Sequence, residues 1–324
     1  MNNQTQTIEK TIESFLDNIK LSRSISTVKT YKNAMKSFTE LLFQKNISID
    51  DSVAVLSEKI FNDYAKYLRA YSYATEGLYI NVARNYFEFL KAQEIKDFNM
   101  YQTKFLIKNN IRKKGVRIIH FPQNEIEEVL DYASNKLPFI EETDEIKKLI
   151  NLRDSALLIT LADTGLRIHE ACNLHKNDVD WEANKAIVIG KGDKEAIIRF
   201  SKRSIMSIKR YLEQREKMYD NDGMFAPIFA RHDKGTGKEI SQITTKTGRL
   251  IVKQRVKESV GEINMDKITP HSFRHYFVTN VLRNTGNIKI AQEFARHSSI
   301  TITERYTHLT NKELDDSYNT IFNV

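Results

Sequence analysis

The sequence predicts a mainly α-helical chain with one small antiparallel β-sheet, divided into two domains. Apolar residues recur at helical spacing through about the first hundred residues, and no proline interrupts residues 1–121. Two β-rich runs, residues 187–189 and 196–198, flank a glycine-containing connection and predict a hairpin. A basic stretch separates the two regions, and 324 residues are enough for two separate cores.

The first domain, residues 1–103, is expected to contain four or five amphipathic helices. Their apolar positions recur every three or four residues, which gives each helix one buried face. These periodic stretches cover residues 8–19, 28–42, 60–68 and 78–90. Ser57 and Thr75 are the expected start signals of the last two helices, because their hydroxyl oxygens can accept free backbone amides.

The second domain is expected at residues 122–324, with a central helix in the apolar run 149–161. Gly165 follows this helix and is expected to adopt a positive φ at its C-terminal end. Thr269 and Pro270 predict the start of another helix. A threonine oxygen can cap a free amide, and proline lacks the amide that would stay unpaired at the first helical position.

His271 and Arg274 would share one face of that helix. Side chains three residues apart lie about 5–6 Å from each other. The free amides and the dipole at a helix start already favour an anion, so a phosphate is the expected occupant. A solvated surface pair is the alternative for these two residues taken alone, and the neighbouring motifs argue against it.

Five short motifs follow one another in the second domain. They are Thr164-Gly165-Leu166-Arg167 with Glu170, Gly190-Lys191-Gly192, His271-x-x-Arg274-His275, His297-Ser298-Ser299 and Tyr306-Thr307-His308. Each alone is a weak signal, but together and in this order they are specific. The chain resembles the tyrosine site-specific recombinases, the lambda-integrase or Xer family. It departs from many relatives at one position, where they carry glycine and this chain has Arg296.

The resemblance implies that two arginines and a tyrosine carry the central chemistry. Arg167 and Arg274 would clamp the scissile phosphate, because fork-shaped guanidinium groups can spread the extra negative charge of the transition state. Tyr306 would attack the phosphate and become esterified to it. Glu170 would orient its neighbours.

Three further side chains would move protons. Lys191, in the predicted hairpin connection, would protonate the leaving oxygen. His271 would act as general base for the tyrosine, and His297 would donate to a phosphate oxygen. The product would be a 3′-phosphotyrosyl enzyme with a free 5′-hydroxyl, and a second round on another duplex would pass through a Holliday junction. The resemblance implies no metal, ATP or other cofactor.

The same resemblance implies an arrangement of domains and subunits. Residues 1–103 would be a core-binding domain and residues 122–324 the catalytic domain, and together they would close on double-stranded DNA as a C-shaped clamp. The protein would be a monomer when free and a homotetramer in the synaptic complex. A final helix at residues 313–322 would dock either on its own domain or on the neighbouring protomer.

Residues 104–121 are expected to be a basic linker between the two domains. A charge run of this kind is usually only a solvated segment. Here it would join two domains that both meet DNA, so we expect it to follow the DNA backbone as well. The side chains expected to contact DNA are Arg112, Lys113, Lys114 and Arg117.

The composition fits a protein that binds a polyanion in a reducing compartment. The net charge is 50 − 42 = +8, which favours a nucleic-acid partner. Cys172 is the single cysteine, so an internal disulfide is excluded and a cytoplasmic location is expected. No apolar run approaches the ~18 residues of a membrane span. The histidine spacing matches no zinc motif.

Two other functions share parts of this pattern. A type IB topoisomerase uses the same chemistry but relaxes supercoils as a monomer. A regulator of the same fold would bind DNA without turnover, and the presence of every catalytic residue argues against it. The target DNA sequence, and the choice between chromosome dimer resolution and integration or excision of a mobile element, stay open.

Overall fold

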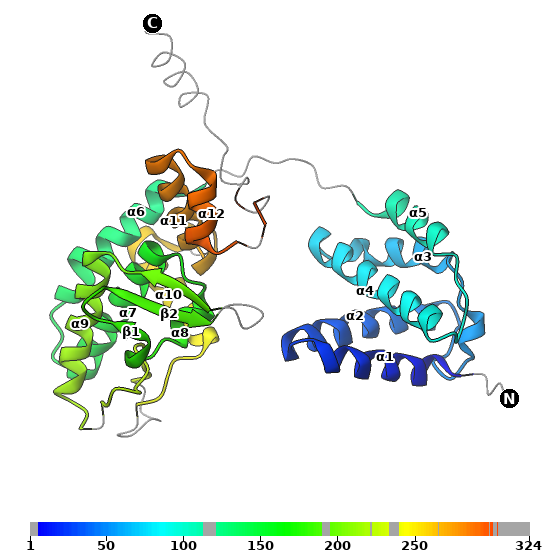
Figure 1. Cartoon of the computed structure of the whole chain (residues 1–324), viewed down its shortest axis with the longest axis horizontal. Helices are drawn as coiled ribbons and strands as arrows, with labels where there is room; N and C mark the ends of the chain where they lie inside the picture. Colours follow the sequence, from blue (N-terminus) through cyan, green and yellow to red (C-terminus); the bar gives the residue numbers. More distant parts are fainter. Residues whose placement is uncertain are drawn as a thin grey trace, which may run out of the picture. The chain divides into compact units, whose positions relative to one another are not determined.

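The chain folds into two compact units, Met1–Ile119 and His120–Val324, each with its own apolar core. The computed structural model describes residues 6–112, 121–189, 195–220, 222–232, 240–264, 266–297, 299–300 and 303. Figure 1 shows helices alone in the first unit and helices with a small sheet in the second. The predicted fold class is confirmed.

Five α-helices form the described part of the first unit. They are α1 (Ile8–Ser22), α2 (Ile25–Gln44), α3 (Ile60–Tyr67), α4 (Tyr73–Ala92) and α5 (Met100–Asn110). Each periodic stretch of the sequence coincides with one of the first four helices, except that Leu68 lies in the short 3-10 turn after α3. On α2, for example, Phe38, Leu41 and Leu42 are buried on one face, as a repeat of three and four residues requires.

The starts of α3 and α4 differ from the sequence expectation. α4 begins after Ser72, whose Oγ accepts the Thr75 backbone amide at 3.2 Å. Thr75 therefore lies inside the helix and is the wrong start signal, because a cap needs extended backbone, which Ser72 has with a ψ of 153°. Ser57 is also wrong, since α3 begins at Ile60 without a side-chain cap.

Aromatic side chains fill the core of the first unit. Phe38, Tyr64, Tyr86 and Phe87 are completely buried. Their rings meet edge to face, and the centroids of Phe38 and Tyr64 are 5.2 Å apart. The Tyr64 hydroxyl donates to the Ala34 carbonyl at 3.1 Å. Tyr64 is therefore part of the core of the first unit.

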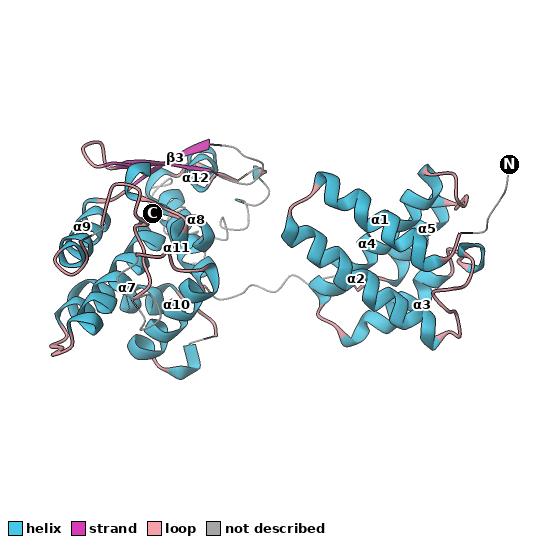
Figure 2. Ribbon diagram, turned by 90° about the horizontal axis from the view of Figure 1, so that it is seen from below, coloured by secondary structure: helices cyan, strands magenta, loops and turns pink. Residues whose placement is uncertain are grey.

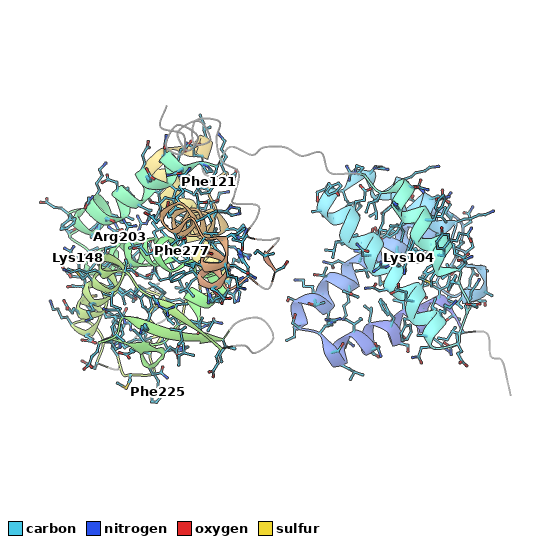
Figure 3. All side chains as sticks on the ribbon, turned by 45° about the horizontal axis from the view of Figure 1, so that its top comes forward. Lys104, Phe121, Lys148, Arg203, Phe225 and Phe277 are labelled. Carbon is cyan, nitrogen blue, oxygen red and sulfur yellow. The ribbon has the colours of Figure 1, made fainter. Side chains whose placement is uncertain are left out.

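The first unit extends further along the chain than the sequence indicated. Residues 104–110, expected in the linker, belong to α5, which packs against α3. Lys104 lies on this helix (Figure 3). The expected domain boundary at residue 103 is wrong because Leu106 and Ile107 pack against the first core. Lys104 and Lys108 suggested a charged linker in the sequence, although Leu106 and Ile107 lie between them.

Arg112 follows α5 and is bound inside the first unit. Its Nε donates to the Glu76 carboxylate, its backbone amide donates to the same carboxylate at 2.9 Å, and its Nη2 donates to the Tyr71 carbonyl at 2.7 Å. Glu76 is completely buried, so a partner cation offsets the cost of desolvating its charge. Arg112 thus ties the end of α5 to α4, and its expected contact with DNA stays a prediction.

The described part of the second unit contains seven α-helices and three strands. The helices are α6 (Gln123–Asp131), α7 (Glu145–Thr164), α8 (Ile168–Cys172), α9 (Lys202–Glu216), α10 (Thr245–Val260), α11 (Pro270–Thr285) and α12 (Ile288–Ala295). The strands are β1 (Val179–Asp180), β2 (Lys185–Ile189) and β3 (Glu195–Arg199).

The predicted central helix of this unit is α7. Asp144 caps it, with Oδ1 accepting the Ile146 amide at 2.9 Å. From Leu149 onward most of its residues are buried, and α9 and α11 pack against it. The buried charges in this helix are paired, with Asp154 bound by Arg153 at 2.7 Å and by Arg255 at 2.8 Å, so the helix can be buried on nearly all sides. Its C-terminal end is therefore held rigidly at the place where the arginine motif begins.

The sheet has the antiparallel order β1-β2-β3, with Ile187 opposite Ile197. Ala186 and Val188 point into the core, whereas Ile187, Ile189 and Ile197 are exposed, as expected for a sheet covered on one face. Figure 2 shows the strands at the margin of the unit with helices on one side. The predicted hairpin strands are confirmed, and Lys191 in their connection lies outside the described residues.

Replacing Gly165 by alanine is expected to lower the free energy of unfolding of the second unit by about 2–4 kcal/mol. Gly165 has the predicted positive φ, 61°, and an added Cβ would lie 2.4 Å from Cδ1 of Phe277, which Figure 3 labels. The measurement is urea unfolding of the full chain followed by fluorescence of Trp181, the single tryptophan. In the control Gly223→Ala, the new Cβ meets no atom within 4 Å. Equal free energies of unfolding for the two variants would contradict the prediction.

Candidate active site

Arg167 lies at the corner between α7 and α8. The chain turns at Gly165, and Arg167 is the residue before the first turn of α8. Its backbone amide donates to Glu170 Oε2 at 2.8 Å, and its Nη1 donates to Glu170 Oε1 at 2.9 Å. These two bonds fix the position of the arginine from both its backbone and its side chain. The Arg167 side chain still keeps 39% of its surface exposed, so it can also reach a ligand.

Glu170 is the buried carboxylate at this corner, with a side chain only 1% exposed. Burial alone would raise the pKa of the Glu170 carboxyl, but the charges of Arg296 and Arg167 and the two hydrogen bonds from Arg167 lower it. Its place in the first turn of α8 adds the favourable field of the helix start. Glu170 is therefore an ionised anchor for the arginines around it.

The predicted start of α11 is confirmed. Pro270 is its first residue, and the Thr269 backbone amide donates to the Ser272 Oγ at 3.1 Å. This closes the first turn, on which His271 lies. Arg274 follows one turn later, and only 2% of its surface is exposed. The local sequence thus places both motif residues near the same helix start.

Arg274 joins three segments that are far apart in the sequence. Its Nη1 donates to the Gly165 carbonyl at 2.6 Å, and its Nη2 donates to the Ala295 carbonyl. The first carbonyl ends α7 and the second ends α12. Arg274 thereby brings the Arg167 corner and the turn before His297 to the same place.

The two motif histidines are uncharged at neutral pH in this setting. Burial and the nearby charges of Arg274 and Arg167 lower the pKa of His271 below its ordinary value. The same causes, with smaller effects of two other histidines, lower the pKa of His297 to about 4. The His297 Nδ1 lies 2.9 Å from the Thr303 Oγ1. An uncharged imidazole can accept a proton through one nitrogen and donate through the other.

His297 is therefore expected to make the free protein sensitive to acid. A folded-state pKa of about 4 against about 6.5 in the unfolded chain means that the unfolded state binds the extra proton first. Stability should fall as pH decreases from about 6.5 to about 4. In an NMR titration, the imidazole signal that is missing from His297→Gln should titrate near pH 4. A midpoint near 6.5 would contradict the prediction.

Arg167, His271 and Arg274 line a common pocket of about 440 Å³. Three other residues that line it belong to no motif predicted from the sequence: His169, Arg249 and Lys253. Among the lining residues Asp266 is the single carboxylate, and it pairs with Lys253 at 2.9 Å. The spacing of Arg249 and Lys253, four residues apart on α10, could have indicated a basic helical face. The pocket is cationic overall and suits an anion such as a phosphodiester.

Several residues chosen from the sequence lie outside the described residues. They are Lys191, Tyr306, Lys113, Lys114, Arg117 and the expected final helix at 313–322. Their expected roles stay predictions. Of the six candidate catalytic residues, the structure therefore describes Arg167, His271, Arg274 and His297, and it brings these four together with Glu170.

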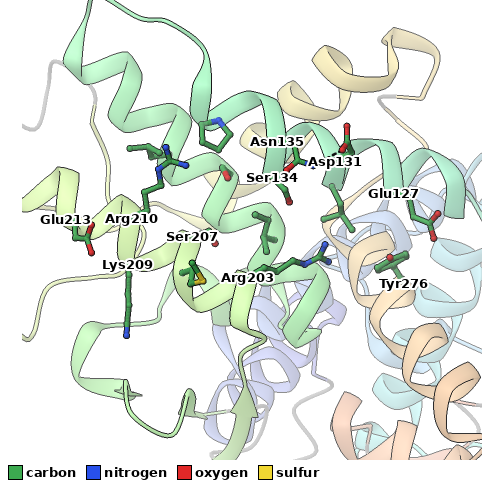
Figure 4. Close-up of a pocket in the computed structure, with 16 residues that line it drawn as sticks. Glu127, Asp131, Ser134, Asn135, Arg203, Ser207, Lys209, Arg210, Glu213 and Tyr276 are labelled. Atoms are coloured by element: carbon green, nitrogen blue, oxygen red, sulfur yellow. Dashed lines mark hydrogen bonds between the residues drawn. The ribbon is translucent and has the colours of Figure 1, made fainter.

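A second and larger cavity, about 860 Å³, shares no lining residue with the arginine pocket. Figure 4 shows its side chains, which come from α6, α7, α9 and α11 and from the segment after α6. Acidic Glu127 and Asp131 line it together with basic Arg203 and Arg210. Because these charges are mixed, the cavity lacks the cationic excess of the arginine pocket.

The described residues contain no cluster of three or more His, Cys, Asp or Glu side chains that could hold a metal ion. None of their helices is both long enough and apolar enough to span a bilayer.

Comparison with known proteins gives the family. A model described as the phage integrase family matches residues 119–313, which is more than half of the chain. The chain belongs to the phage integrase family. The tyrosine recombinase XerC of Staphylococcus aureus strain JH9 is 28% identical over 310 residues, which cover 94% of each chain. The predicted class of enzyme, a tyrosine recombinase, is confirmed.

Solved structures of other tyrosine recombinases have the same fold as this integrase-family chain. The XerH recombinase bound to a palindromic difH substrate matches with a TM-score of 0.68 and 19% identity, over 96% of this chain and 84% of that one. The Tn1549 transposon integrase in complex with transposon right end DNA matches with a TM-score of 0.68 and 16% identity, over 98% and 100%. At these identities the likeness is one of fold.

Proposed function

We propose that this tyrosine recombinase acts on specific sites in double-stranded DNA and that Tyr306 is its nucleophile. The observation that carries the proposal is the convergence of Arg167, His271 and Arg274 on one cationic pocket. Two guanidinium groups can hold a phosphodiester and offset the charge of its transition state, and a neutral imidazole can take the proton of an attacking tyrosine. The family match, which includes the Tyr306 motif within residues 119–313, supports the same assignment.

Arg167 and Arg274 hold the scissile phosphate in this scheme. Each guanidinium can donate two N–H groups to phosphate oxygens, and their charges offset the negative charge that builds up in the transition state. Arg274 is already fixed by two backbone carbonyls, and Arg167 is fixed by Glu170. The donors are therefore oriented before the substrate arrives, which lowers the cost of reorganisation during the reaction.

Proton transfers complete the cleavage step. A phenol has an ordinary pKa of about 10, so Tyr306 needs a base, and neutral His271 takes its proton. The Tyr306 oxygen forms a bond to phosphorus, and the bond from phosphorus to the 5′-oxygen breaks. Lys191 gives a proton to that leaving oxygen, while His297 donates to a phosphate oxygen. The phosphodiester energy is kept in the tyrosyl ester, so rejoining needs no ATP.

The proposed partner is DNA that carries two recombination sites. XerH and the Tn1549 integrase were each solved in complex with DNA, which supports the same partner for this chain. Exchange of strands between two duplexes through a Holliday junction needs several active sites at once, so we assign a homotetramer to the synaptic complex and a monomer to the free protein. The cytoplasm, where chromosomal and mobile-element DNA is accessible, is the proposed location.

The test begins with the DNA. Fragments crosslinked to the protein are sequenced to find a site, and a nicked duplex with that site is incubated with the full chain. The expected result is an SDS-stable protein–DNA adduct on the 3′-phosphate, and recombination between two sites. Relaxation of supercoils without recombination would favour the topoisomerase alternative. Specific binding with no adduct on any duplex would favour a non-catalytic regulator.

A further inference from the structure

Arg296 is placed where its backbone conformation disfavours it. It ends α12 with φ 55° and ψ 44°, in the left-handed region, directly before His297. Glycine adopts this conformation without strain, whereas a residue with a Cβ does so at a cost. An arginine at this position therefore costs backbone stability relative to glycine, and it places a long cationic side chain there.

The Arg296 side chain reaches the Arg167 corner. Its Nη2 lies 2.9 Å from Glu170 Oε2, and the other oxygen of the same carboxylate accepts from Arg167. One buried carboxylate is thus shared by two guanidinium groups, although Glu170 and Arg296 are 126 residues apart in sequence. The Arg296 side chain is 13% exposed and is not among the residues that line the arginine pocket.

Two donor nitrogens of the Arg296 side chain take no part in the ion pair with Glu170. Its Nε and Nη1 are buried, and they have no hydrogen-bond partner among the residues that the structure describes. Buried unpaired donors destabilise a fold. Strained backbone and unpaired polar atoms that persist together are typical of functional sites, where the arrangement is kept for what it positions.

The turn that carries Arg296 has two other fixed points. Arg274 donates to the Ala295 carbonyl, and the Gln292 Nε2 donates to the His297 carbonyl at 3.1 Å. Together with the ion pair between Arg296 and Glu170, these bonds connect the turn at residues 295–297 to Arg167 and Arg274. A movement of Glu170 would therefore reach Arg167 on one side and His297 on the other.

We infer that Arg296 is a positioning residue, which anchors the Glu170 carboxylate so that Arg167 and His297 keep fixed places around the bound phosphate. The inference rests on the proposed function and deepens it. Arg296 acts through Glu170 and does not touch the substrate. Its cation is the functional part, and its backbone conformation is the cost of placing that cation there.

Three variants of the full chain separate the cation from the backbone. Arg296→Lys keeps the charge, Arg296→Met keeps most of the side-chain length without charge, and Arg296→Gly relieves the backbone. The measurement is the rate constant of adduct formation on the nicked duplex at saturating protein, together with the dissociation constant for DNA. The Met and Gly variants should lower the rate constant about 10- to 100-fold, as a small misplacement of catalytic groups does. DNA affinity should change by less than about threefold. Lys should recover most of the rate, because Arg296 contacts Glu170 through a single donor, Nη2, which an ammonium group can replace.

A double-mutant cycle tests whether Arg296 acts through Glu170. Glu170→Gln should slow adduct formation, and adding Arg296→Met to it should produce little further loss, because the shared partner is already gone. Lys289→Met, which removes an exposed cation from the same helix α12, is the charge-matched control and should keep the wild-type rate. Trp181 fluorescence during urea unfolding reports whether each variant is folded.

The outcomes are distinct. If Arg296→Met or Arg296→Gly forms the adduct at the wild-type rate, the inference is overturned and the proposed function stands. Multiplicative losses in the double mutant, or a loss in DNA affinity alone, overturn it as well, because Arg296 would then act independently of Glu170. If the wild type itself forms no adduct on any duplex, the proposed function fails and the inference fails with it.

Discussion

A chain with Tyr306→Phe is expected to form no covalent adduct with a nicked duplex that traps the wild type. The phenol oxygen is the atom that bonds to phosphorus, and phenylalanine removes this atom while keeping the ring. Removing the nucleophile of an enzyme that forms a covalent intermediate costs at least about 10⁴-fold in rate. The measurement is an SDS gel of the denatured reaction with end-labelled DNA.

DNA binding distinguishes loss of chemistry from loss of structure in this experiment. The Tyr306→Phe chain should bind the duplex with wild-type affinity, because the arginine pocket stays intact. Tyr101→Phe, at an exposed tyrosine of α5, is the matched control and should keep full adduct formation. An adduct that persists in Tyr306→Phe would show that another side chain attacks the phosphate and would overturn the assignment.

A chain with Arg274→Lys is expected to form the adduct about 10²- to 10³-fold more slowly. This is the usual effect of removing one oriented donor from a charged transition state. Lysine keeps the charge but replaces a planar fork by a single ammonium group. It cannot reach both the Gly165 and the Ala295 carbonyls, which Arg274 now joins, and also serve a phosphate. The measurement is the single-turnover rate constant at saturating protein.

Two further variants distinguish a loss of catalysis from a loss of folding. Arg167→Lys changes the partly exposed arginine of the same pocket, so its slower adduct formation cannot be attributed to a collapsed core. Arg203→Lys is the matched control, because Arg203 also holds a carboxylate with two donors, Nε at 2.8 Å and Nη2 at 2.6 Å from Asp163, but lies outside the pocket. A wild-type rate for Arg274→Lys would contradict the proposed clamp.

Local patterns in the sequence predicted those features that depend on neighbouring residues. The spacing of apolar residues indicated helices α1 to α4, and an apolar run indicated the central helix α7. Two β-rich runs around a glycine-containing connection indicated the hairpin. Gly165 and Pro270 marked the end of one helix and the start of another, as the structure has them. These features could be read because hydrogen bonds within four residues and a single buried face decide them.

The site was predictable only in part, because most of its contacts join residues that are far apart in the sequence. The order of motifs selected Arg167, His271, Arg274 and His297 as a group, but no local rule says which side chain meets which. Arg249 and the pocket along α10 were missed, because that helix has no motif of its own.

By itself, then, the sequence determined the helical class, the hairpin and the set of side chains with the right chemistry. Tertiary structure alone decided that α5 belongs to the first unit and that Arg112 is paired with buried Glu76. It also decided that Glu170 is shared by Arg167 and Arg296. The Arg112–Glu76 and Arg296–Glu170 pairs join residues 36 and 126 positions apart. A buried charge takes whatever partner the packed fold brings near it, since an unpaired one would be too costly.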